Sequence, residues 1–191
     1  MAKNNWPEWL PVRDDLRGER PYGAPQLDVT VRLNTNENPY ALPDAVVAEV
    51  QREISQVAIG LNRYPDRDAI ELRGALATYL TSQGAPTLSV GQVWAANGSN
   101  EIIQQIFMAF GGNDRRAIGF VPSYSMHSNI ARSTQTAWID GVRGPGFSLT
   151  ADSIVTQATN ASAHLVFLTS PNNPTGTSLD PQIISVVAAA M

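Results

Sequence analysis

Short apolar runs alternate with stretches of helical periodicity from Gln92 onward, and this alternation restricts the fold more than any other feature of the chain. The runs predict strands near residues 93–96, 117–121, 137–139 and 164–168. Between two of them, apolar residues recur at helical spacing, most clearly at Ile102, Ile106 and Phe110. Strands that alternate with helices favour a mostly parallel sheet covered by helices. The sequence therefore predicts an α/β fold.

The first part of the chain has a different character. Four prolines interrupt residues 1–33, which we expect to form an irregular, extended arm. Asp44 is expected to cap a first helix, because apolar residues follow it at helical spacing. Asp68 with Glu71 three residues later resembles a capping box and predicts the start of a second helix.

Composition excludes several classes of function. The net charge of −4, without a cluster of basic residues, argues against a nucleic-acid partner. No apolar run is long enough for a membrane span, and the first six residues carry no apolar leader. The absence of cysteine fits a cytoplasmic protein. His127 and His164 have no acidic or histidine neighbours at ligand spacing, so we expect no metal site.

The string from Ser170 to Gly176, Ser-Pro-Asn-Asn-Pro-Thr-Gly, follows an expected strand and precedes Asp180-Pro181, a good helix start. Ligands of such sheets bind at the carboxyl ends of the strands, where this turn would lie. Asn-Pro alone mostly marks a turn without a ligand. The whole string, however, resembles the Asn-Pro-Thr-Gly signature of the class I and II aminotransferases, enzymes of pyridoxal phosphate. That resemblance implies that Asn173 donates a hydrogen bond to the 3′ oxygen of the cofactor.

Two further turns fit the same family. Asn97-Gly98-Ser99-Asn100-Glu101 opens a helix whose free N–H groups favour an anion, although a capped helix without a ligand would show the same pattern. The resemblance implies that Gly98 and the N–H groups of Ser99 and Asn100 hold the cofactor's phosphate. Tyr124 could be an ordinary core aromatic. The family has an aromatic residue here, stacked on the pyridine ring.

Four segments resemble one subfamily, the histidinol-phosphate aminotransferases, and residues 94–101 and 119–127 are most similar to its actinobacterial members. The four segments are Arg17–Pro25, Leu33–Tyr40, Arg63–Asp66 and Pro122–Met126. The resemblance implies that Tyr22 and Asn36 bind the substrate. It also implies that Tyr64 reaches the phosphate of the cofactor bound to the other subunit of a homodimer.

The resemblance implies a partial three-layer α/β/α sandwich, the large domain of pyridoxal-phosphate transferases, preceded by an irregular arm. We expect residues 1–43 to form the arm and substrate-pocket segment. Residues 44–191 would be an incomplete cofactor-binding domain that ends before the Schiff-base lysine. The family places that lysine in a Ser-x-Lys segment downstream of Asn-Pro-Thr-Gly, and the only lysine here is Lys3. We therefore assign no catalytic residue to this chain.

The implied reaction is transamination between histidinol phosphate and 2-oxoglutarate, which becomes glutamate, in histidine biosynthesis. We expect this chain to be the N-terminal part of such an enzyme and to be inactive alone. An aromatic aminotransferase or a threonine-phosphate decarboxylase would have the same fold. A non-catalytic remnant that binds at most a partner subunit is the alternative from a different class.

Overall fold

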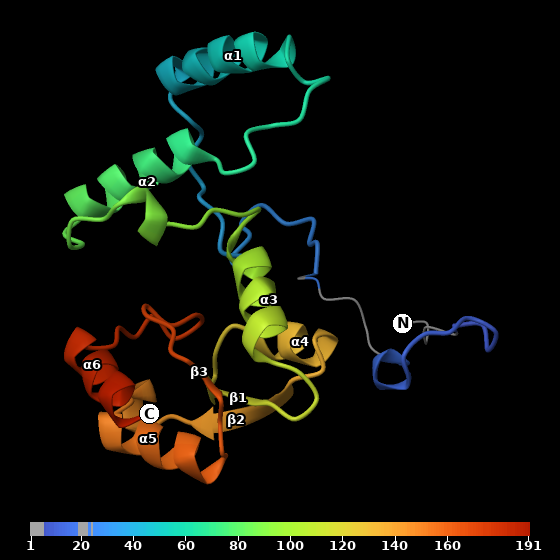
Figure 1. The fold of residues 1–191 in the computed structure, drawn as a ribbon, viewed down its shortest axis with the longest axis vertical. Coiled ribbons are helices and arrows are strands. Elements are labelled where there is room, and N and C mark those ends of the chain that lie inside the picture. Colours follow the sequence, from blue (N-terminus) through green and yellow to red (C-terminus); the bar gives the residue numbers. More distant parts are fainter. Residues whose placement is uncertain (1–5, 19–22, 24) are drawn as a thin grey trace. The chain divides into compact units, whose positions relative to one another are not determined.

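A computed structural model gives the fold and describes residues 6–18, 23 and 25–191 (Figure 1). The chain forms two compact units. One comprises residues 1–18 and 96–191, and the other comprises residues 19–95.

The first unit contains a parallel sheet of three strands. They are β1 (Arg116–Val121), β2 (Ala137–Val142) and β3 (Leu165–Phe167), in the order β2-β1-β3. Arg116 pairs with Ala137 at one edge of β1, and Ala117 pairs with Leu165 at the other edge. The strands expected near 117–121, 137–139 and 164–168 are confirmed, and so is the parallel arrangement.

Helices cover both faces of this sheet. They are α3 (Ser99–Phe110), α4 (Met126–Ser133), α5 (Ala151–Asn160) and α6 (Pro181–Ala190), with a 3-10 turn, η3 (Pro145–Phe147), before α5. Asp180 caps α6 as expected, because its carboxylate accepts a hydrogen bond from the Gln182 N–H at 2.8 Å.

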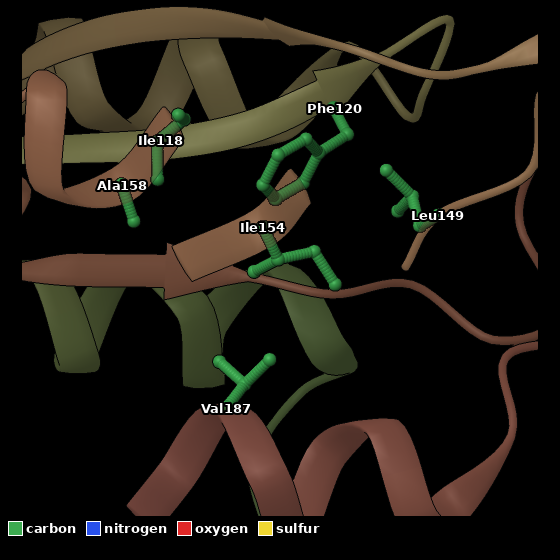
Figure 2. Close-up of a cluster of buried hydrophobic side chains, with 6 residues drawn as sticks. All are labelled: Ile118, Phe120, Leu149, Ile154, Ala158 and Val187. Atoms are coloured by element: carbon green, nitrogen blue, oxygen red, sulfur yellow. The ribbon is translucent and has the colours of Figure 1, made fainter. Parts of the chain in front are cut away.

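Alternate residues of β1 enter two separate cores. Ala117 packs with Phe107 of α3 and with Ile130 and Ala131 of α4. Ile118 and Phe120 face the opposite side, because successive side chains of a strand point to opposite faces. There they join a second core of six buried side chains (Figure 2), namely Ile118, Phe120, Leu149, Ile154, Ala158 and Val187. These two cores confirm the three-layer α/β/α sandwich.

Residues 6–18 contain a single 3-10 turn, η1 (Asp14–Leu16), in agreement with the expected irregular arm. Within the first unit, Arg13 connects this segment to the end of α4. Its guanidinium donates to the carbonyl of Ser133 at 3.0 Å and to the carbonyl of Arg132 at 3.3 Å. A cation suits this place, because the last carbonyls of a helix carry partial negative charge.

The second unit holds α1 (Asp44–Ala58), α2 (Ile70–Ser82) and the 3-10 turn η2 (Val90–Gln92). The strand expected at 93–96 is absent from the described sheet. The carbonyl of Val93 instead accepts a hydrogen bond from the Arg73 side chain, Nε to O, at 2.6 Å. A strand exists only through its ladder partner, and the described residues supply none for this run.

Both predicted helix caps of the second unit are wrong. Asp44 lies inside the first turn of α1, and no side chain caps that helix at Pro43. The cap of α2 comes from Asp66, whose carboxylate accepts from the Ile70 N–H at 2.9 Å. Asp68 instead forms an ion pair with Arg67 at 2.9 Å.

None of the helices in the described residues is long and apolar enough to cross a membrane. Within the same residues, no group of His, Asp or Glu side chains could hold a metal ion.

Candidate active site

Three turns of the first unit meet at the carboxyl edge of the sheet. They span residues 97–101, 122–125 and 169–177. Asn100 joins the first turn to the second, since its Nδ2 lies 3.4 Å from the hydroxyl of Tyr124. Asn172 joins the third turn to the second by donating from Nδ2 to the Pro122 carbonyl at 3.0 Å. The second and third turns follow β1 and β3, and parallel strands end at the same edge, which explains why these two distant segments come together.

The first turn presents the start of α3. Gly98 precedes the helix with φ +85°, a backbone conformation that favours glycine. No side chain caps the first turn of α3. The Glu101 carboxylate accepts instead from the N–H of Asn97, before the helix, at 2.6 Å. The N–H groups of Ser99 and Asn100 therefore have no capping side chain, and the helix dipole favours an anion beside them.

The second turn carries Tyr124, which is partly buried and belongs to neither of the two cores. Its ring meets the ring of His127 edge-on, with centroids 5.6 Å apart. His127 in turn contacts Phe167 of β3, with centroids 5.2 Å apart. Burial lowers the pKa of the His127 imidazole, so the neutral form is favoured. Tyr124 thus stands at the rim of an aromatic cluster and leaves part of its surface exposed.

The third turn places its two adjacent asparagines differently. Asn173, the residue predicted to contact the cofactor, is exposed. Asn172 is only 2% exposed and binds the Pro122 carbonyl and the Thr175 hydroxyl through its amide nitrogen. Asn172 is not among the site residues that the sequence predicts. The two adjacent asparagines indicated that an amide matters in this turn, but the sequence does not reveal which of the two is buried.

Two buried oxygens of this site have no hydrogen-bond partner within the described part of the chain. They are Oδ1 of Asn100 and Oδ1 of Asn172. Leaving a buried acceptor unpaired costs about 1–3 kcal/mol. Uncapped N–H groups and a partly exposed aromatic ring together suit a planar aromatic ligand that carries an anionic group. The residues present therefore fit a cofactor such as pyridoxal phosphate.

The remaining predicted residues do not belong to the described part of the first unit. Tyr64 and Asn36 belong to the other compact unit, where both are exposed. The side chain of Tyr64 is as exposed as in a free peptide, at 101%. Tyr22 lies outside the described residues, as does Lys3.

Comparison with known families agrees with the fold. The family model named aminotransferase class I and II matches residues 28–191. The chain belongs to this family of enzymes.

Individual relatives narrow the comparison. A histidinol-phosphate aminotransferase of Mycobacterium marinum is 55% identical over 170 residues, which are 89% of this chain and 44% of the relative. The chain thus spans less than half the length of that curated relative.

Solved structures share the fold at low identity. Aspartate aminotransferase from Thermus thermophilus with maleate aligns with a TM-score of 0.71 at 20% identity, covering 83% of this chain and 41% of that one. Histidinol-phosphate aminotransferase from Sinorhizobium meliloti, in complex with pyridoxal-5′-phosphate, aligns with a TM-score of 0.64 at 18% identity. That alignment covers 74% of this chain and 37% of the other.

Proposed function

We propose that this chain supplies the phosphate-binding and ring-binding residues of a pyridoxal-phosphate-dependent histidinol-phosphate aminotransferase. The reaction would transfer the amino group of histidinol phosphate to 2-oxoglutarate and so form glutamate. The single observation that carries the substrate assignment is the 55% identity to a curated relative of that name. The convergence of the three turns at the sheet edge supports the cofactor.

Each turn has its own task in this proposal. The N–H groups of Ser99 and Asn100 bind the phosphate, and Gly98 allows the backbone to approach it. The ring of Tyr124 lies against the pyridine ring, and Asn173 donates its amide to the 3′ oxygen. When bound, the cofactor supplies the carbonyl that accepts the amino group and the ring that delocalises the electron pair.

The second unit would serve the substrate and a partner subunit. We assign residues 1–43 to the arm and substrate-pocket segment, with Tyr22 and Asn36 as substrate contacts. Tyr64 would reach the cofactor of the partner in a homodimer. Its complete exposure supports this assignment, and so does α1, in which no residue is buried. The apolar positions of α1 include Val47, Val50, Ile54 and Val57, and all four are exposed.

Proton transfer at the reacting carbon needs a positioned base, and we assign none to these residues. A positioned acid or base typically contributes about 10²–10⁴-fold to the rate. The only lysine, Lys3, lies near the start of the arm in sequence. We therefore expect the 191-residue chain to bind pyridoxal phosphate weakly and to show no transaminase turnover.

The test combines spectroscopy with a coupled assay. Purified chain is titrated with pyridoxal phosphate, and its visible spectrum is recorded before and after borohydride. Turnover is measured with histidinol phosphate and 2-oxoglutarate, and with aromatic amino acids and threonine phosphate as competing substrates. Saturable binding without turnover supports the proposal. Turnover, together with cofactor reduced onto Lys3, would require a different mechanism.

The gene provides an independent test of the same proposal. The reading frame is sequenced past the codon for Met191. We expect a downstream Ser-x-Lys segment, and the longer product should convert histidinol phosphate. A stop codon directly after Met191 would favour the non-catalytic alternative instead.

A further inference from the structure

Asn172 is buried in a way that the proposed contacts do not explain. It is 2% exposed, although its neighbour Asn173 is exposed. Its Nδ2 donates to the Pro122 carbonyl at 3.0 Å and to the Thr175 hydroxyl at 2.8 Å. Both amide hydrogens are thereby used, one on a distant turn and one on its own turn.

The backbone of Asn172 closes the turn that contains Asn173. The N–H of Asn172 donates to the Thr177 carbonyl at 2.8 Å, and the N–H of Gly176 donates to the Asn172 carbonyl at 2.7 Å. The hydroxyls of Thr175 and Thr177 lie 2.8 Å apart inside this turn. Asn173 therefore sits in a loop whose two ends meet on Asn172.

The other partner of Asn172 leads to the second turn of the site. Pro122 stands two positions before Tyr124. A second contact links the same two turns, since the hydroxyls of Ser123 and Thr169 lie 3.4 Å apart. Asn172 thus connects the loop of Asn173 with the loop of Tyr124.

Stability alone does not explain an asparagine at this position. Its Oδ1 is buried without a partner among the described residues. Rotating the amide would place that oxygen against the Pro122 carbonyl, and two acceptors cannot bond to each other. An apolar side chain of similar size would avoid the unpaired oxygen. The two donors of Nδ2 are therefore the feature that only asparagine provides here.

We propose that Asn172 is the positioning residue of this site. It sets the separation between Asn173 and Tyr124 by holding the 172–177 turn against the end of β1. This inference rests on the proposed function, in which those two residues contact pyridoxal phosphate. Asn172 acts through its neighbours and makes no contact with the cofactor itself.

The first experiment measures amide hydrogen exchange of the chain without cofactor. Asn172→Asp keeps the size of the side chain but removes both donors, and Asn172→Leu also removes the unpaired oxygen. We expect the Gly176 amide to exchange about tenfold faster in both variants, the factor that a lost buried hydrogen bond produces. Asn113→Asp, in an exposed turn, makes the same chemical change and should leave this amide unaffected. Unchanged exchange at Gly176 in both Asn172 variants would overturn the inference.

The second experiment asks whether Asn172 acts through Asn173. Pyridoxal phosphate is titrated into the unaltered chain, Asn172→Leu, Asn173→Ala and the double variant. Because a positioning residue acts through the residue that it holds, the affinity losses should not multiply. We expect each single variant to bind about tenfold more weakly and the double variant no worse than Asn173→Ala.

Wild-type affinity in Asn172→Leu, or losses that multiply, would show that Asn172 does not position Asn173. Failure of the proposed function would look different, because the unaltered chain would then show no saturable binding. The exchange measurement still decides in that case whether Asn172 holds the turn.

Discussion

The side chain of Gln157 pairs with Val142 as a neighbouring strand would. Its Oε1 accepts from the Val142 N–H at 2.7 Å, and its Nε2 donates to the Val142 carbonyl at 3.0 Å. Val142 ends β2, and its partner in β1, Val121, lies on the other side. Gln157 of α5 therefore occupies the outward-facing backbone groups of Val142, the last residue of β2. No such closure occurs at the free edge of β3 within the described residues.

This asymmetry predicts how the chain associates with itself. The N–H of His164 donates to the Arg116 carbonyl of β1. Because the backbone N–H and C=O groups of successive strand residues point to alternate sides, those of Leu165 and Phe167 point toward the free edge. Exposed apolar edges recruit other strands. We expect Gln157→Ala to open a second edge and to increase self-association, measured by light scattering over a range of concentrations. Gln104→Ala, on the exposed surface of α3, is the matched control. Equal scattering by the two variants would contradict this role of Gln157.

Replacing Gly98 should weaken cofactor binding. An alanine at φ +85° and ψ 166° is strained, and we expect Gly98→Ala to destabilise the fold by about 1–3 kcal/mol. The same change should displace the N–H groups of Ser99 and Asn100 and lower the affinity for pyridoxal phosphate. Gly146→Ala provides the control, because Gly146 also has a positive φ, of +63°, in η3. Both variants should lose stability in urea unfolding, but only Gly98→Ala should lose affinity.

The burial of His127 predicts a loss of stability in acid. Its pKa is lowered in the folded state by burial, and aromatic rings of Tyr124, Trp138 and Phe167 surround it. As the pH falls below the ordinary value of 6.5, the unfolded chain takes up a proton that the folded chain resists. The contribution of His127 to the free energy of unfolding is thus complete above pH 6.5 and declines as the pH falls below that value.

The measurement is urea unfolding at a series of pH values. His127→Asn should flatten the stability profile below pH 6.5, by a slope of no more than about 1.4 kcal/mol per pH unit. If the variant and the unaltered chain keep parallel profiles, the imidazole does not titrate in this way.

The core beneath α5 and α6 should be sensitive to lost volume. Ile154 is fully buried, at 0% exposure, among the six side chains of Figure 2. Ile154→Ala should lower the free energy of unfolding by about 2–5 kcal/mol, because the cavity that it leaves closes only in part. Ile184→Ala makes the same change on α6, where Ile184 is 45% exposed, and should cost far less. Similar losses in chemical unfolding would show that α5 is packed less tightly than described.

The proposed role of Tyr64 can be tested in the longer protein by mixing subunits. One subunit carries Tyr64→Phe, and the other carries a substitution of the downstream lysine. If Tyr64 serves the partner's cofactor, one site of the mixed dimer regains both intact groups, and activity recovers. Activity that does not recover on mixing, although the dimer forms, would place Tyr64 in its own subunit's site.

Local patterns in the sequence were sufficient for most of the secondary structure. The strand at 117–121 and the helix with Ile102 and Ile106 follow from periodicities that adjacent residues carry. The Asp180 cap also acts within three residues. Ser170–Gly176 could be placed after a strand for the same reason, whereas the strand expected before Asn97–Glu101 is absent from the described sheet.

Relationships over long distances in the chain could not be read in this way. The run at 93–96 has the composition of a strand, but strand formation depends on a partner elsewhere, and Arg73 binds its backbone instead. Asn172 and Asn173 are chemically identical neighbours. Burial distinguishes them because the carbonyl of Pro122, fifty positions earlier, accepts a hydrogen bond from Asn172. Only the folding of β1 and β3 side by side brings those two groups within 3.0 Å.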